Sequence, residues 1–122
     1  MTNKIKTDVD AIVIGSGFAG LALIHYLRDA GLSVKVFDKA SDIGGTWTWN
    51  RYPGAMTDSE GYYYCLAFSK ELLQKWTWSQ RYPAWEETHR YMHFIADECD
   101  MWPHIQLNTA VTNAEYREDS GT

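Results

Sequence analysis

The feature that most constrains this chain is a glycine triplet placed directly after a short apolar run near its start. Residues 12–20 read Ile-Val-Ile-Gly-Ser-Gly-Phe-Ala-Gly, which is the pattern G-x-G-x-x-G. Asp38 follows about 20 positions later at the end of a second apolar run, the spacing typical of a dinucleotide-binding βαβ unit. The pattern therefore predicts an α/β domain with a parallel sheet that binds a nucleotide cofactor.

The residues around the triplet predict the elements that such a unit needs. Ala11–Ile14 suits a buried parallel strand, and residues 18–27 carry apolar side chains at helical spacing, with the helix ending near Gly31. Residues 33–38 predict the second strand. Because strand, glycine turn, helix, strand and acid follow in this order, we place the βαβ unit at about residues 8–40.

Each glycine of the triplet has its own expected steric role. Gly15 lets the chain turn sharply out of the strand, Gly17 leaves no Cβ to block a pyrophosphate, and Gly20 lets the helix pack closely on the sheet. The pyrophosphate is expected at the helix N-terminus, where unpaired N–H groups favour negative charge. Asp38 could accept hydrogen bonds from both ribose hydroxyls, and Lys39 beside it is too weak a signal to indicate a 2′-phosphate.

Composition limits the classes of function. The 122 residues suit one small domain, 45% of them are hydrophobic, and the net charge of -5 disfavours nucleic acid. The first eight residues lack the apolar core of a signal peptide, and no apolar run is long enough to span a bilayer, so we expect a cytoplasmic protein without a membrane partner. Cys65 and Cys99 lack CxxC spacing, which favours free thiols without a catalytic role.

The chain after residue 40 divides into three expected segments. Residues 41–68, rich in Gly, Trp and Tyr, predict a long ligand-wrapping loop. Residues 69–102 predict helices. Short strands are expected over residues 104–117, at 104–107 and at 110–116. A turn-forming Asp-Ser-Gly then follows where a hairpin would return, so we expect the front section of a longer protein.

Two helices are expected in the middle segment. The first runs from Ser69 to Trp76, with Ser69 as N-cap and with Glu71 and Lys75 paired four residues apart. The second runs from about Pro83 to Met101, with Pro83 in its first turn.

Two other patterns are discounted. His89 and His93 are four residues apart on the second helix, but no third ligand is evident and Arg90 stands where an HExxH motif needs Glu, so we expect surface or packing histidines and no metal. The Tyr62-Tyr63-Tyr64 run could stack on bases, but an acidic chain without a Lys/Arg stripe argues against a nucleic-acid partner.

A second glycine-rich segment identifies a family. Residues 41–58 read Ser-Asp-Ile-Gly-Gly-Thr-Trp-Thr-Trp-Asn-Arg-Tyr-Pro-Gly-Ala-Met-Thr-Asp, in which paired glycines and Trp rings suit a second close approach to an extended aromatic cofactor. This stretch resembles the N-terminal FAD-binding segment of type I Baeyer-Villiger monooxygenases, in the flavin-containing monooxygenase superfamily. The resemblance continues to residues 109–114 and covers nearly the whole chain. It implies a Rossmann-like, glutathione-reductase-like domain, incomplete here, that ends in the first part of a β-hairpin or meander and binds FAD rather than NAD.

The resemblance also implies individual site residues. It implies that Gly15, Phe18 and Ala19 line the pyrophosphate, Asp38 the ribose, Thr46 and Trp47 the ribityl and flavin region, and Asp58, Tyr64 and Val111 the flavin or adenine. The complete set of expected FAD-binding residues is Gly15, Gly17, Phe18, Ala19, Gly20, Asp38, Lys39, Gly45, Thr46, Trp47, Asp58, Tyr64 and Val111.

Asp58 is also the expected catalytic residue. The family places the equivalent acid beside an arginine from later in the chain, near the reactive face of the flavin, where the carboxylate anchors that cation. From the residues alone, an Asp after Ala-Met-Thr is more typical of a loop cap. Met56-Thr57 stands where many members of the family carry Arg-Cys. This chain therefore lacks the arginine to which a nicotinamide contact would be assigned.

The activity implied is that of the parent protein. NADPH would reduce FAD, and O2 would then form a flavin peroxide that attacks a ketone carbonyl to give an ester or lactone. The alternatives are an N- or S-hydroxylating flavin monooxygenase and a non-catalytic nucleotide-binding module. The sequence contains no second glycine triplet for NADPH, so the NADPH site is expected largely outside this segment. We therefore expect the segment alone to be inactive and to need the rest of the polypeptide as well as ketone and O2.

Overall fold

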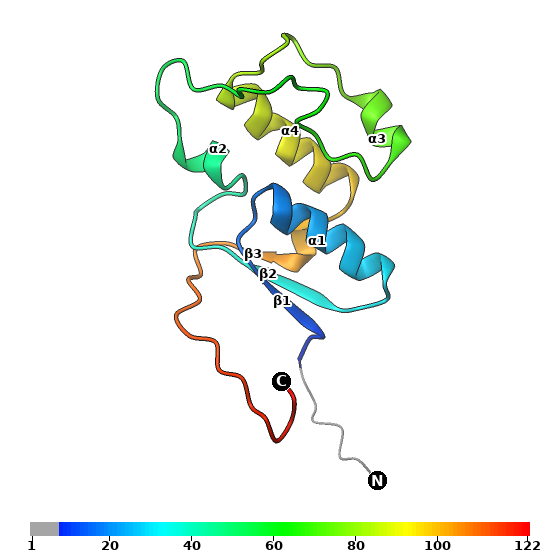
Figure 1. Ribbon diagram of the computed structural model, residues 1–122, viewed down its shortest axis with the longest axis vertical. Coiled ribbons are helices and arrows are strands. Elements are labelled where there is room, and N and C mark those ends of the chain that lie inside the picture. Colours follow the sequence, from blue (N-terminus) through cyan, green and yellow to red (C-terminus); the bar gives the residue numbers. More distant parts are fainter. Residues whose placement is uncertain (1–7) are drawn as a thin grey trace.

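A computed structural model describes residues 8–122, so the first seven residues of the N-terminal stretch considered above lie outside the described part. The elements, in chain order, are β1 (Ala11–Ile14), α1 (Phe18–Asp29), β2 (Val34–Phe37), α2 (Thr46–Trp49), α3 (Lys70–Lys75), α4 (Trp85–Glu98), the 3-10 turn η1 (Trp102–His104) and β3 (Ile105–Gln106). Figure 1 shows α1 and the sheet in the middle of the molecule, with α2, α3 and α4 above them and the C-terminal segment below.

The three strands form one parallel sheet in the order β1-β2-β3. Ala11 pairs with Val34, and Val36 pairs with Ile105. The expected βαβ unit is confirmed, and β1 has the predicted bounds. Alternate residues of a strand point to opposite faces, so Val13 is buried towards α1 while Ile12 and Ile14 are 60% and 67% exposed on the other face.

The hydrophobic core lies between the sheet, α1 and α4. Helix α1 buries Leu21 and Ile24, and α4 buries Met92 and Ile95, all four with 0% exposure. Their spacing of three residues places each pair on one helical face, as the sequence pattern predicts. Each such side chain contributes about 1.5–3 kcal/mol on burial. This core fixes the C-terminal ends of β1 and β2, where the cofactor site is expected.

Helix α3 begins as predicted but does not form the predicted ion pair. The Ser69 hydroxyl accepts a hydrogen bond from Leu72 N at 3.4 Å, which makes Ser69 the N-cap. The expected pair of Glu71 with Lys75 is wrong, because Ser69 donates to Glu71 and Lys75 instead forms an ion pair with Glu98 of α4. A tertiary neighbour has replaced the local partner.

Helix α4 begins two residues later than predicted. Ala84 is the N-cap and Trp85 the first helical residue, so Pro83 precedes the helix instead of lying in its first turn. The reason is a contact with an earlier segment: Thr57 N donates to Pro83 O at 3.0 Å, and Met56 and Ala84 form an antiparallel bridge. The chain is held extended at that point.

The second predicted C-terminal strand is not formed. Only Ile105–Gln106 is a strand, Asn108 turns at a φ of 52°, and residues 111–117 have no regular secondary structure. Apolar alternation cannot form a strand without a neighbour to pair with, and within residues 8–122 this segment has none. Tyr116 is accordingly 70% exposed. Residues 118–121 form a turn, but no hairpin.

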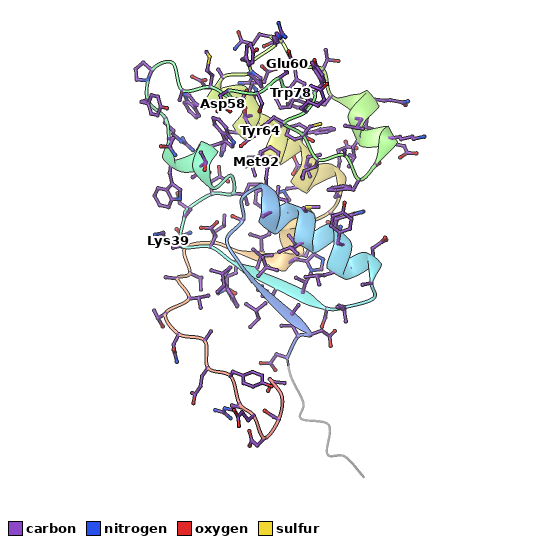
Figure 2. The ribbon with its side chains drawn as sticks, in the orientation of Figure 1. Lys39, Asp58, Glu60, Tyr64, Trp78 and Met92 are labelled. Carbon is purple, nitrogen blue, oxygen red and sulfur yellow. The ribbon has the colours of Figure 1, made fainter. Side chains whose placement is uncertain are left out.

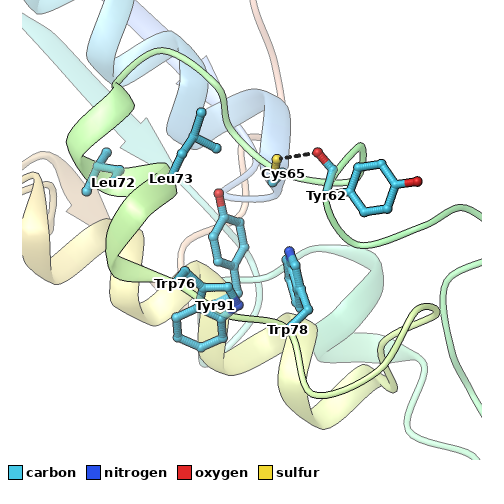
Figure 3. Close-up of a pocket in the computed structure, with 7 residues that line it drawn as sticks. All are labelled: Tyr62, Cys65, Leu72, Leu73, Trp76, Trp78 and Tyr91. Carbon is cyan, nitrogen blue, oxygen red and sulfur yellow. Dashed lines mark hydrogen bonds between the residues drawn. The ribbon is translucent and has the colours of Figure 1, made fainter.

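An aromatic cavity of about 270 Å³ lies between α3, α4 and the loop before α3 (Figure 3). It is lined by Tyr62, Cys65, Leu72, Leu73, Trp76, Trp78 and Tyr91. None of the expected cofactor residues lines this cavity. Cys65 and Cys99 are both free, as expected, and burial raises the pKa of each thiol.

Tyr91 on the wall of this cavity makes alkaline stability testable. Its hydroxyl accepts a hydrogen bond from Leu66 N at 2.8 Å, and burial raises its pKa to about 12. Since the unfolded chain ionises near pH 10, stability is fully present below pH 10 and is lost as the pH rises towards 12. We expect the free energy of unfolding to fall by up to about 3 kcal/mol over this range. Urea titrations at pH 9 and 11.5 should show this loss in the wild type and not in Tyr91→Phe.

Tyr116→Phe is the matched control for that measurement, because Tyr116 is exposed and its loss should leave the pH profile unchanged. Equal profiles for the wild type and Tyr91→Phe would contradict the assignment of the alkaline loss of stability to Tyr91.

Within residues 8–122, no helix has both the length and the apolar character needed to cross a membrane.

Candidate cofactor-binding site

The glycine turn joins β1 to α1 with two close backbone contacts. Gly15 has a φ of 100°, which favours glycine, and its N–H donates to Phe37 O at 2.8 Å. A Cβ on Gly20 would lie 2.0 Å from Gly15 O, a distance that no real contact has. Gly20 therefore lets α1 pack against the turn, which is the steric role expected of the third glycine.

Gly17 differs from its two neighbours in the triplet. Its φ is -77°, open to any residue, and a Cβ there would meet Gly45 Cα at 3.6 Å, an ordinary contact. Neither backbone conformation nor packing within the described residues requires glycine at this position. Gly45, in turn, has a φ of 54°, and its own Cβ would lie 3.1 Å from Gly17 Cα. The two glycine-rich loops thus face each other, and Gly44 N donates to Ser16 O at 3.0 Å to tie them together.

Asp38 stands at the end of β2 and is only 8% exposed. One carboxylate oxygen accepts from the Ser16 N–H (2.7 Å) and the Ser16 hydroxyl (2.6 Å), and the other accepts from Ala40 N at 2.9 Å. Burial opposes its ionisation, but these hydrogen bonds and the charge of Lys39 outweigh it, so the pKa of Asp38 lies below its ordinary value. A carboxylate oxygen can accept two hydrogen bonds, so Oδ1, with one, retains capacity for a ligand.

A first cavity, of about 280 Å³, lies at the ends of β1 and β2. It is lined by Ile14, Gly15, Phe37, Asp38, Lys39, Thr109, Ala110 and Val111. Four of these are expected cofactor residues. Lys39 is exposed with its Nζ 5.9 Å from the centre of the Trp49 ring, and Val111 is brought to the cavity because Thr109 N donates to Asp38 O at 2.8 Å.

Three expected aromatic residues form a cluster beside the glycine loops. The Trp47 indole N–H donates to the Tyr64 hydroxyl at 3.2 Å, and the Phe18 and Tyr64 rings meet edge to face at 4.9 Å. Phe18 and Tyr64 also line a second cavity of about 240 Å³. Residues from α1, α2 and the following loop thus meet at Tyr64.

A third cavity, of about 350 Å³, brings Asp58 to the same cluster. It is lined by Thr46, Trp47, Asn50, Tyr52, Ala55, Met56, Thr57, Asp58 and Tyr64. Asp58 is exposed, and within residues 8–122 it has no hydrogen-bond or ionic partner. Figure 2 shows Asp58 and Tyr64 in the upper part of the molecule and Lys39 lower, near the end of β2. The neighbouring Thr57 is 3% exposed and its hydroxyl donates to Ser59 O, which fixes the loop.

The fold therefore brings most of the expected residues to cavities. Gly17 and Gly45 line none of the three, but lie in contact between the two loops, while Gly20 packs on the turn and Ala19 is exposed in the first turn of α1. Sequence reasoning missed Ser16, which holds Asp38 with both its N–H and its hydroxyl. The position of Ser16 inside the glycine triplet, next to the strand end that carries Asp38, could have predicted this contact.

A parallel sheet with a glycine turn and an acid at adjacent strand ends defines a dinucleotide-binding domain. The chain belongs to the family described as NAD(P)-binding Rossmann-like domain, which it matches over residues 13–76. It is 50% identical over 113 residues to acetone monooxygenase (methyl acetate-forming) of Gordonia sp. (strain TY-5). The matched region covers 93% of this chain and 21% of that protein. It is 47% identical over 121 residues to a Baeyer-Villiger monooxygenase of Pseudooceanicola batsensis, covering 98% of this chain and 22% of that protein.

A solved structure has a similar backbone fold. Oxidized steroid monooxygenase bound to NADP superposes with a TM-score of 0.90 at 44% identity, over 93% of this chain and 22% of that one. These similarities confirm the resemblance to Baeyer-Villiger and related flavin monooxygenases and the predicted Rossmann-like fold. The chain spans about a fifth of the length of these relatives.

Proposed function

We propose that this chain is the FAD-binding segment of an NADPH- and O2-dependent monooxygenase that converts a ketone into an ester or lactone. The observation that carries the proposal is Gly17, because neither its backbone conformation nor its packing within residues 8–122 requires glycine, and its N-cap position equally suits Ser, Asn or Asp. A missing Cβ at the start of a helix leaves room for the phosphates of a ligand. The 43% identity over 112 residues to the FAD-binding monooxygenase VdtE of Byssochlamys spectabilis then favours FAD as that ligand.

The residues present fit FAD in three regions. The pyrophosphate is assigned to the loop from Gly15 to Ala19 at the N-terminus of α1, and the ribose to the free acceptor position of Asp38. Lys39 and Val111 border the adenine end, through the first cavity. Gly45 permits close approach of the second loop.

The flavin end is assigned to the third cavity. Its walls include Thr46, Trp47 and Tyr64, with Phe18 beside them. The bound flavin supplies the electron transfer and oxygen chemistry, while the protein positions the ring system and shields it from water. Asp58 is proposed to anchor an arginine from outside this chain, since a carboxylate without a partner among residues 8–122 is available for a charge-assisted pair.

The proposal includes a parent protein whose other parts supply most of the NADPH site and the substrate pocket. It also includes a cytoplasmic location, in keeping with two free thiols. The substrate class is a ketone, with O2 as co-substrate.

Replacing Gly17 with alanine tests the carrying observation. The new Cβ makes only an ordinary contact with Gly45, so the flavin-free protein should lose at most about 1 kcal/mol of stability, the cost of a poorer N-cap residue. The same Cβ should collide with the pyrophosphate, and we expect FAD affinity to fall by more than about tenfold, the effect of 1.4 kcal/mol. Flavin absorbance after dialysis and fluorescence titration with FAD measure this in the full-length protein. Undiminished flavin content would contradict the proposed phosphate site.

The activity itself is tested with the full-length protein and NADPH, O2 and linear and cyclic ketones. Ester or lactone products together with ketone-dependent NADPH oxidation support the proposal. Hydroxylated amines or sulfoxides, without ester products, would instead identify an N- or S-oxidising enzyme. A colourless protein that consumes no NADPH would identify a non-catalytic nucleotide-binding module.

A further inference from the structure

A cluster of two histidines and one aspartate lies outside the cavities of the proposed FAD site. His89 and His93 occupy successive turns of the same face of α4, as residues four apart do. The sequence shows no third ligand next to them, but the folded chain supplies a third group. The fold brings Asp42, 51 positions before His93, from the loop after β2 to both imidazoles.

The ligand atoms of the three side chains converge. His89 Nε2 lies 3.1 Å from Asp42 Oδ2, and His93 Nε2 lies 2.9 Å from Asp42 Oδ1. One such atom from each residue can be chosen so that all lie within 4.8 Å of one another. A tetrahedral ion with bonds of about 2.1 Å keeps its ligands about 3.4 Å apart. The observed separations are therefore a few tenths of an ångström short of those around a bound ion.

The surroundings hold these side chains and leave them accessible. The side chains of His89, Asp42 and His93 are 15%, 28% and 35% exposed, so solvent ions can reach the cluster. Asp42 is oriented by a hydrogen bond from Ile43 N to Oδ1 at 2.8 Å. The positive charge of Arg51 also acts on His89 and is unfavourable for a cation, although its guanidinium is directed over the Trp85 ring at 5.1 Å.

We propose that Asp42, His89 and His93 bind a divalent transition-metal ion, for which Zn²⁺ is the best match. Two imidazole nitrogens and one carboxylate oxygen form a donor set typical of zinc, whereas Mg²⁺ and Ca²⁺ prefer oxygen alone. Three protein ligands leave the fourth position of the tetrahedron to water. Each imidazole must offer an unprotonated Nε2 to the ion, so a neutral ring binds it as the tautomer that carries its proton on Nδ1. For His89 the ion also replaces the contact of Nε2 with Ile43 O at 3.1 Å.

The bound ion would join the second glycine loop to α4. Asp42 is followed by Ile43, Gly44 and Gly45, and Gly45 contacts Gly17 of the first loop. A Cβ on Gly44 would lie 2.9 Å from His89 Cδ2, so this loop already packs on the histidine. An ion at the cluster would thus restrain the loop that faces Gly17. Binding of the ion needs only the three side-chain ligands and does not depend on bound FAD.

The test uses full-length protein without a histidine tag, stripped of metal by chelation. Equilibrium dialysis against Zn²⁺ and the visible spectrum of added Co²⁺ report binding directly. We expect His93→Asn and Asp42→Asn each to lose one equivalent of high-affinity Zn²⁺, or to weaken it by at least about tenfold, because even outer-shell changes cost 10–100-fold. A tetrahedral Co²⁺ spectrum that these two variants lack would support the site.

His25→Asn is the matched control, because it removes an imidazole that stacks on Phe68 and is not part of the cluster. It should bind Zn²⁺ as the wild type does. Wild-type stoichiometry and affinity in both His93→Asn and Asp42→Asn would overturn the proposal, and two variants guard against one that fails to fold, as checked by circular dichroism. Flavin content is measured in parallel, so loss of zinc with flavin retained separates this site from the proposed FAD site.

Discussion

Replacing Gly20 with alanine is expected to destabilise the domain by about 3 kcal/mol or more, the upper range for overpacking. The added Cβ would lie 2.0 Å from Gly15 O and 3.0 Å from Gly15 C. Both atoms belong to the backbone, so no side chain can rotate away to relieve the contact. Either α1 must move off β1 or the glycine turn must open, and each change disrupts the core around Leu21 and Ile24.

The measurement is the thermal unfolding midpoint of the flavin-free full-length protein. Gly17→Ala is the matched control, since it adds the same methyl group three residues earlier at an ordinary contact distance of 3.6 Å. We expect the position 20 variant to lose about 3 kcal/mol or more of stability, and the position 17 variant to lose FAD affinity with at most about 1 kcal/mol of stability. Equal midpoints for the two variants would show that the turn is softer than its geometry indicates.

Replacing Asp38 with alanine is the second change with a large expected effect. It leaves the Ser16 N–H, the Ser16 hydroxyl and Ala40 N without their acceptor in a buried place. Each unsatisfied buried group costs about 1–3 kcal/mol, so a loss of about 3 kcal/mol in the free energy of unfolding is a conservative expectation.

Acid titration provides a second readout for Asp38. Its folded pKa lies below the ordinary value of 3.8, so its contribution to stability is present above about pH 4 and is lost as the pH falls through the folded pKa. Denaturant titrations at pH 3 and pH 6 should therefore differ less in Asp38→Asn than in the wild type. Asp29→Asn, at an exposed carboxylate, is the control and should keep the wild-type difference. An unchanged difference in Asp38→Asn would show that this carboxylate is not stabilised by folding.

Local patterns predicted the βαβ unit well because its determinants are local. The apolar run of Ala11–Ile14, the triplet and the spacing of apolar residues in α1 each specify one element without distant partners. The same holds for Ser69, whose hydroxyl caps the helix that follows it directly. The positions of Phe18, Trp47 and Tyr64 came from family resemblance, since no periodicity brings three such distant residues together.

The wrong predictions concern residues whose structure is determined by contacts with parts of the chain distant in sequence. Lys75 forms its ion pair with Glu98 and not with Glu71, and the hydrogen bond from Thr57 N to Pro83 O keeps Pro83 outside α4. Residues 110–116 have strand-like alternation but no neighbouring strand among the described residues. The His89 and His93 pair gained its third group, Asp42, only through folding. In each case the sequence identifies the residue that interacts, but not the distant residue or strand with which it would pair.

The outer face of the sheet has a practical consequence for solubility. Ile12 and Ile14 of β1 lie uncovered there, and strands of a parallel sheet are normally covered on both faces. Uncovered branched apolar side chains side by side favour self-association, and β1 is also an edge strand with unpaired backbone groups. Purified by itself, the 122-residue chain is therefore expected to aggregate with increasing concentration, because of this surface and not because of its core.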